Sequence, residues 1–218
     1  MKRNRKQAGT IWIAMGLLLI AAALCFAAYN LYDSLRAQRA SDDIIAQLEQ
    51  LPGEEPTEPV RETVPEGETA PVETIPVPDF VRFPDMEMPV ERIRGIDYIG
   101  VLRIPALEME LPVTSWWSYD HLQVAPCRYT GSAYLRNMVI CGHNYPSHFG
   151  NLKNLTEGDL ATFTDMDGNV FTYRMVERET LQPTDVEGME SGDWDLTLFT
   201  CTVGGKLRVT IRFAQEAP

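Results

Sequence analysis

A cysteine and an arginine stand where the sequence predicts two neighbouring strands. The segment DLTLFTCTVGGKLRVTIRF, 195–213, alternates in polarity on both sides of a Gly-Gly pair, which is typical of a β-hairpin. Counting outward from Gly204 and Gly205 as a two-residue turn places Cys201 directly opposite Arg208. A guanidinium there could favour a thiolate or donate hydrogen bonds to a developing oxyanion. The hairpin alone leaves open the alternative of an exposed arginine beside an inert cysteine.

The two faces of this hairpin predict which side meets a hydrophobic core. Alternation puts Leu198 and Ile211 on one, mostly apolar face, whereas Cys201, Arg208 and Arg212 share the other face. The sequence therefore predicts that the polar pair lies outside the core.

A nucleophilic cysteine needs a base or an ion-pair partner, and the chain has 3 histidines. His143 follows a predicted strand and a glycine in MVICGH, a position from which a side chain can project at a barrel rim. His148 lies in the loop that follows, and His121 lies in the polar segment SYDHLQ. Position ranks His143 first, His148 second and His121 third, and a structural or solvent-facing histidine is the alternative for the last two.

Short apolar runs separated by turn residues predict the strands that must position these groups. The runs are YIGVLRIP, MELPVT, NMVICGH, ATFTD, NVFTYRMVERE, LTLFTCT and KLRVTIRF. Their spacing predicts a closed or nearly closed β-barrel with little helix. TDMDGNVF superficially resembles a calcium loop, but an Asp-Gly hairpin turn between two strands explains Asp165, Asp167 and Gly168 without a metal.

The N-terminal part of the chain has a different composition. Residues 11–29 are free of charge and long enough to cross a bilayer as a helix, which predicts a membrane anchor. Lysines and arginines within residues 1–10 place the N-terminus in the cytoplasm and the remainder outside. A cleaved secretory signal is the alternative.

Residues 30–91 predict an extracellular stalk, which begins with a short helix at about Ala40 to Leu51. Residues 51–90 contain ten acidic residues and only two basic ones, both arginines. Nine of the 15 prolines lie in the same segment. Such a segment buries little and stays extended. Residues 92–218 form the predicted β-domain, and the net charge of −12 argues against a nucleic-acid partner.

Three cysteines lie beyond the anchor, so at least one is a free thiol outside the membrane. Cys127 and Cys141 either form a disulfide or are two buried unpaired cysteines. Cys201 is the predicted nucleophile.

Several motifs resemble the sortase family. TLFTC, 197–201, matches the TLxTC signature of sortases, and Arg208 takes the place of their essential arginine on the following strand. VICGHN resembles the strand that supplies their histidine, here His143. The segments YIGVLRIPALEMELPV and NLKNLTEGDLATFTD resemble the opening strand pair and the run after the histidine, so the resemblance extends over the whole predicted domain.

The resemblance implies a mostly β fold, an eight-stranded sortase barrel, and a cysteine transpeptidase activity. Cys201 would attack the threonine carbonyl of an LPxTG-like sorting motif, with His143 as ion-pair partner and acid-base catalyst and Arg208 on the oxyanion. Thr200 and Arg212 are the predicted substrate-binding residues. Arg212 is also the second candidate for the role given to Arg208. This chemistry requires no metal and no organic cofactor.

The implied partners are surface proteins or pilins with a C-terminal sorting signal, and an acceptor amine from a cell-wall precursor or a pilin lysine. The implied location is the cell membrane of a Gram-positive-type envelope, with the catalytic domain outside. The short Gly-Gly turn leaves the sortase class open, with a class B- or D-like member expected. An extracellular thiol hydrolase of similar peptides and a non-catalytic surface-displayed β-domain are the alternative functions.

Overall fold

The computed structural model describes residues 3–50 and 77–216, so residues 51–76 of the predicted stalk lie outside the described residues. The helices are α1 (Arg3–Leu48), α2 (Asp79–Arg82), α3 (Tyr119–Leu122) and α4 (Val186–Glu190), with 3-10 turns η1 (Pro105–Leu107) and η2 (Phe149–Asn154). The strands are β1 (Glu91–Ile93), β2 (Ile96–Ile104), β3 (Met109–Thr114), β4 (Cys127–Thr130), β5 (Met138–Cys141), β6 (Leu160–Asp165), β7 (Val170–Leu181), β8 (Leu196–Cys201) and β9 (Arg208–Gln215).

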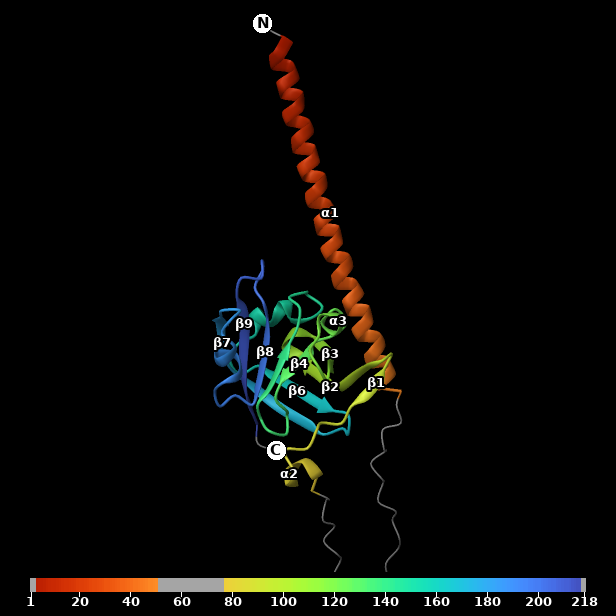
Figure 1. The fold of residues 1–218 in the computed structure, drawn as a ribbon, viewed down its shortest axis with the longest axis vertical. Coiled ribbons are helices and arrows are strands. Elements are labelled where there is room, and N and C mark those ends of the chain that lie inside the picture. The colour runs from red at the N-terminus through yellow and green to blue at the C-terminus, as the bar shows by residue number, and fades with distance from the viewer. Residues whose placement is uncertain (1–2, 51–76, 217–218) are drawn as a thin grey trace, which may run out of the picture.

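Eight of these strands close into a barrel, which confirms the predicted fold class (Figure 1). Neighbouring strands follow the order β2-β3-β4-β5-β8-β9-β7-β6, and β6 pairs with β2 to complete the ring. β1 lies outside the ring and pairs only with β2 among the described strands. Closure leaves the barrel strands without unpaired edges.

All seven strands predicted from apolar runs are present, but β4 and β1 were not predicted. β4 has four residues, and its pairing with β5 is interrupted by a register shift after Arg128. β1 has three residues. Strands this short contain too few alternating positions to stand out in a sequence.

The β8–β9 hairpin has the predicted register. Cys201 pairs with Arg208, and the pairing continues in step to Leu196 and Phe213. The turn is wider than the predicted two residues. The last hydrogen bond before it runs from Thr202 N to Leu207 O at 2.9 Å, so the strands stop pairing earlier than predicted. The predicted core face is also confirmed, since the side chains of Leu196, Leu198, Ile211 and Phe213 are fully buried.

The turn between β6 and β7 is the predicted Asp-Gly hairpin turn. Gly168 has a φ of +81°, a left-handed conformation that glycine adopts easily. The Asp165 carboxylate accepts hydrogen bonds from the backbone of Asp167 and Asn169 and from the Tyr134 hydroxyl. These bonds give the aspartate a structural role in the turn.

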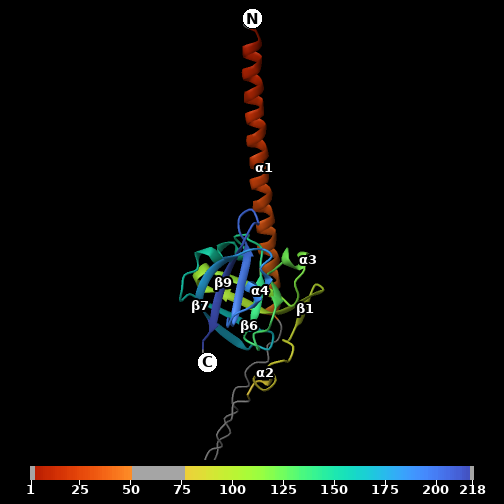
Figure 2. The same ribbon diagram turned by 60° about the vertical axis from the view of Figure 1, so that its left-hand side comes forward.

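α1 is one continuous helix of 46 residues, and its two parts differ in environment (Figures 1 and 2). The large apolar side chains between Ile11 and Tyr32 are exposed, and the helix is long and apolar enough to cross a membrane. Farther along, one face packs on the barrel with Ser34, Ala37 and Ser41 buried. The segment predicted as the start of a stalk is therefore a docked helix, because buried side chains recur on one helix face at intervals of three or four residues.

The chain also contacts the barrel again before β1. Phe80 of α2 stacks on Tyr134 with ring centroids 4.7 Å apart and lies 5.3 Å from the ring of Phe171. α2 lies at the end of the barrel opposite to the end from which the N-terminal part of α1 projects (Figures 1 and 2).

Candidate active site

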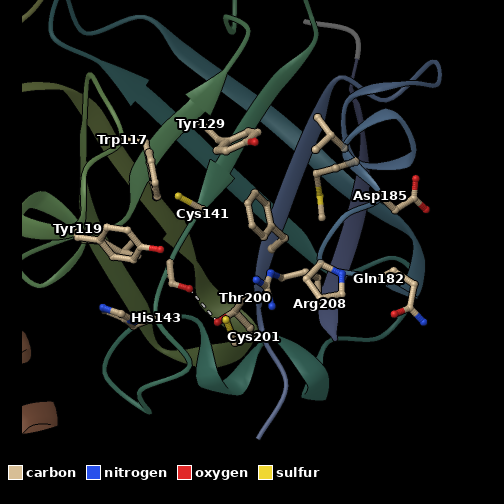
Figure 3. A pocket seen from close by; sticks show the side chains of 16 residues that line it. Trp117, Tyr119, Tyr129, Cys141, His143, Gln182, Asp185, Thr200, Cys201 and Arg208 are labelled. Carbon is tan, nitrogen blue, oxygen red and sulfur yellow. Dashed lines mark hydrogen bonds between the residues drawn. The ribbon is translucent and has the colours of Figure 1, made fainter. Parts of the chain in front are cut away.

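A cavity of about 310 Å³ opens beside the ends of β5 and β8 (Figure 3). Sequence analysis predicted four of its residues as site residues, and these are His143, Thr200, Cys201 and Arg208. Most of the remaining lining residues lie on two sides of the cavity. One side is aromatic and comes from β4 and the segment that precedes it. The other side comes from α4 and the segment between β7 and α4. The cavity thus brings together groups from distant parts of the chain.

Cys201 and Arg208 lie opposite each other at the open end of the β8–β9 ladder. Cys201 is the last residue of β8 and Arg208 the first of β9, and both side chains are half-buried. The guanidinium of Arg208 donates to the carbonyl oxygens of Gly205 at 3.2 Å and Leu207 at 3.3 Å. Because an arginine has five N–H donors, it can bind the turn and still donate to a ligand in the cavity.

Thr200 connects β8, the strand of Cys201, to the end of β5, which His143 follows. Its hydroxyl donates to the carbonyl oxygen of Gly142 at 2.8 Å, while Gly142 N donates to Phe199 O at 3.1 Å. β5 and β8 run parallel, so their ends meet at the same edge of the barrel. Thr200 lines the cavity, as a predicted substrate-binding residue should, but its buried hydroxyl also fixes the backbone beside the histidine.

His143 lies across the cavity from Arg208, in the loop directly after β5 (Figure 3). Its ring packs against the ring of Tyr145, with centroids 4.8 Å apart and planes inclined by 32°. Burial lowers the pKa of His143, and the negative charge of Asp33 on α1 opposes this by raising it.

The other two histidines do not line the cavity. His148 is fully buried, and burial together with the charge of His143 lowers its pKa to about 4. It therefore stays neutral near neutral pH. His121 lies in α3 with Nδ1 3.0 Å from the carbonyl oxygen of Trp116. Of the three histidines, His143 is the one that lines the cavity.

Cys141 is a second thiol in the cavity lining, and its environment differs from that of Cys201. Cys141 pairs with Cys127 across β4 and β5, and both are buried free thiols. The Cys141 thiol donates to Cys127 O at 3.5 Å. The neighbouring Cys127 thiol and burial raise the pKa of Cys141, which disfavours the nucleophilic thiolate.

Arg212 does not line the cavity, in contrast to its prediction as a substrate-binding residue. Its side chain is only 2% exposed. The guanidinium donates to Glu179 Oε1 at 2.7 Å, Thr197 Oγ1 at 2.9 Å and the backbone oxygen of Met189 at 2.9 Å. α4 covers this position, which strand alternation alone did not predict, so Arg212 holds α4 in place and supports the cavity wall indirectly.

The aromatic side of the cavity was not predicted from the sequence. Trp117 lies 5.2 Å from Tyr119 and 6.4 Å from Tyr129, and Tyr129 lies 5.5 Å from Phe199, between ring centroids. The cluster of aromatic residues in TSWWSYDHL was the available signal, because aromatic rings in a polar segment need a surface to contact.

The opposite side of the cavity, formed by the segment from β7 to α4, was also missed. Asp185 caps α4 by accepting from Gly188 N at 2.9 Å. Asp185 and Gln182 lie across the cavity from the aromatic side (Figure 3). This side combines the polar Gln182 and Asp185 with the apolar Pro183, Val186 and Met189.

Comparisons with solved structures show which proteins share this fold. Sortase A from Corynebacterium diphtheriae has a similar fold, with a TM-score of 0.52 at 21% identity over 56% of this chain and 62% of that one. Sortase C from Streptococcus pneumoniae gives a TM-score of 0.51 at 26% identity over 58% of this chain and 69% of that one. The chain thus spans less than two thirds of the first of these structures. No curated protein matches.

The sequence profile of the sortase domain matches residues 102–215, just over half of the chain. That range contains the strands β3 to β9 and all the cavity groups described above. The chain belongs to the sortase family of cysteine transpeptidases.

Proposed function

We propose that the protein is a membrane-anchored sortase in which Cys201 is the nucleophile, His143 the acid-base catalyst and Arg208 the oxyanion ligand. The observation that carries the proposal is the cavity that all three residues line, with Cys201 and Arg208 paired across one ladder. Cys141, the other thiol there, is a poor alternative because its thiolate is disfavoured.

Acylation begins when the Cys201 thiolate attacks the threonine carbonyl carbon of an LPxTG-like motif. Arg208 donates to the oxygen on which negative charge develops. The C–N bond after the threonine then breaks, and protonated His143 gives its proton to the leaving amine. The product is a thioester between the substrate threonine and Cys201.

Transfer then follows with a new amine. Neutral His143 accepts a proton as this amine attacks the thioester, the C–S bond breaks, and Cys201 regains its thiolate with protonated His143 beside it. A new amide bond is formed, and no electrons are exchanged. Transfer to water instead of an amine would make the enzyme a hydrolase.

The substrates we propose are surface proteins or pilins with a C-terminal sorting signal, and the acceptor is a cell-wall or pilin lysine amine. The Streptococcus pneumoniae sortase C is described in connection with pilin substrate specificity, which supports pilins as one option. The aromatic side of the cavity supports an apolar segment in the recognised peptide.

We also propose that α1 crosses the cell membrane with its N-terminus in the cytoplasm. The apolar, exposed side chains between Ile11 and Tyr32 and the basic residues that precede them support this arrangement. The barrel then lies outside the cell, where sorting signals and wall precursors are accessible.

The test uses the full chain in detergent micelles with a panel of sorting-motif peptides. Mass spectrometry should detect a peptide adduct on Cys201 that hydroxylamine removes, as expected for a thioester. Cys201→Ala should abolish the adduct. His143→Ala should slow its formation by about 10²- to 10⁴-fold, and Arg208→Ala by about 10²- to 10³-fold.

Cys141→Ala is the matched control, because it removes a thiol from the same cavity and should leave adduct formation nearly unchanged. An adduct that persists in Cys201→Ala and disappears in Cys141→Ala would contradict the assignment of the nucleophile. Release of the acyl group only as free acid, with no amine accepted, would indicate the hydrolase.

A further inference from the structure

The docked part of α1 contacts the loop that carries the catalytic histidine. Ser147 Oγ donates to the backbone oxygen of Ser34 at 2.9 Å, so the helix and the loop are directly bonded. Farther along the helix, Ser41 Oγ donates to Val124 O at 3.2 Å, and Asp43 pairs with Arg94 at 2.5 Å. The helix is therefore attached at several points, and one of them adjoins the site.

Tyr145 lies between the helix and His143. Its hydroxyl donates to Asp33 Oδ2 on α1 at 2.9 Å, and its ring packs against the imidazole ring. Burial and the Asp33 carboxylate raise the pKa of Tyr145 to about 12, so the phenol remains a donor at neutral pH. One side chain thus touches both the N-terminal helix and the histidine.

The backbone around Tyr145 is also restrained. Its carbonyl oxygen accepts from His148 N at 3.0 Å and from Gly150 N at 2.9 Å. A Cβ on Gly150 would lie 2.5 Å from Asn144 O and 2.7 Å from Tyr145 O, so only glycine permits this close approach. The remaining freedom of Tyr145 is the rotation of its side chain, which the bond to Asp33 restricts.

We propose that Asp33 and Tyr145 are positioning residues that hold the His143 ring at the cavity, so that the N-terminal helix completes the active site. The proposal rests on the catalytic role proposed above for His143. Asp33 acts by orienting Tyr145, and Tyr145 acts through its ring contact, so neither residue touches the substrate.

The charges around His143 give the proposal a second readout. The titratable or charged groups near it are Asp33 on α1, Tyr145 and His148 in the same loop, Cys201 on β8 and Arg208 on β9. The negative charge of Asp33 favours protonated His143, the form that gives a proton to the leaving amine. Asp33→Asn should lower the pKa of His143 and shift the alkaline limb of the acylation profile to lower pH.

The experiment compares Asp33→Ala, which removes the acceptor of the Tyr145 hydroxyl, with Tyr145→Phe in the full chain in micelles; Asp33→Asn keeps an acceptor oxygen and tests the charge alone. Acylation kcat should fall about tenfold in Asp33→Ala and in Tyr145→Phe, with KM changed by less than about twofold, because positioning affects the chemical step more than binding. Tyr145→Phe keeps the ring, so a fall in its acylation kcat reports on the loss of the hydroxyl hydrogen bond alone. Asp43→Asn removes another helix-to-barrel contact away from the cavity, and its kcat and pH profile should match those of the wild type.

NMR titration of the histidine rings separates this proposal from the proposed function. The chain has 3 histidines, so His143→Gln identifies the His143 signal by its loss. A His143 titration and a pH profile that stay unchanged in Asp33→Asn and Tyr145→Phe, while Cys201 remains active, would overturn the positioning role. Full activity in His143→Gln would instead overturn the catalytic role of His143, and the titrations would still show whether Asp33 acts on its ring.

Discussion

Cys201 and Arg208 occupy neighbouring strands of one hairpin, whereas His143 lies in a loop beyond the end of β5. The first pair is fixed by the backbone ladder from Leu196 to Cys201 and from Arg208 to Phe213. The loop of the histidine is held by Tyr145, which bonds to Asp33 of α1 and packs on the His143 ring, and by Thr200, which bonds to Gly142. We call these the strand side and the loop side of the site.

The two sides differ in the range of the interactions that hold them. The strand side is built from residues close in sequence, with hydrogen bonds that repeat along a ladder. On the loop side, Tyr145 and Asp33 are separated by 112 positions in the chain. Contacts of this kind form only when the helix and the barrel dock, so the loop side should be more sensitive to changes outside the cavity.

The largest effect on stability is expected on the strand side from Arg212→Met. Its buried guanidinium pairs with Glu179 and bonds to α4, and the substitution leaves these partners unsatisfied. The free energy of unfolding should fall by about 3–5 kcal/mol in a denaturant titration. Arg103→Met, which breaks a surface pair with Glu110, should change it by less than about 1 kcal/mol. Equal losses in both variants would contradict the role of Arg212.

A smaller effect is expected on the loop side from Gly142→Ala. The new Cβ would lie 2.7 Å from the ring of Phe149, which is fully buried and has little room to move. We expect a loss of about 1–3 kcal/mol of stability and slower acylation, because Gly142 adjoins His143. A second substitution, Phe149→Leu, should restore part of the acylation rate. Failure of this rescue would show that the clash is not the cause.

The smallest effect is expected at the helix, from Ser41→Ala. The substitution removes one buried hydrogen bond to Val124 O and should lower the free energy of unfolding by about 1 kcal/mol. Weaker docking should increase trypsin cleavage at Arg36 and Arg39, which are exposed on α1. Ser34→Ala should have less effect, because the Ser34 contact with Ser147 also uses the backbone oxygen. Unchanged cleavage in Ser41→Ala would show that this bond does not hold the helix.

The difference between the two sides also explains what the sequence could predict. Strand alternation and the Gly-Gly turn placed Cys201 opposite Arg208, because pairing in a hairpin depends on a count of residues. The same count placed Arg212 on the Cys201 face correctly, but it did not predict that α4 covers it. Burial of that position depends on a segment far along the chain, and local alternation contains no information about it.

The docking of α1 was missed although a pattern was present. Ser34, Ala37, Ser41 and Ile44 are the buried positions, and their spacing follows one helix face. Two of them are serines and one is alanine, so hydropathy alone does not identify the face. Small side chains allow close approach of the helix to the barrel, but they give a weak signal beside the apolar run that precedes them.

In the membrane-anchored arrangement that we propose, the continuity of α1 sets how far the cavity lies from the lipid surface. Asp33 follows Tyr29, the end of the predicted span, by four residues, which corresponds to about 6 Å of helix. The β8–β9 turn lies at the end of the barrel from which the N-terminal part of α1 projects (Figures 1 and 2). With α1 across the bilayer as we propose, the cavity lies in a thin layer at the membrane, in which the tethered substrates and acceptors that we propose would diffuse in two dimensions at a high local concentration.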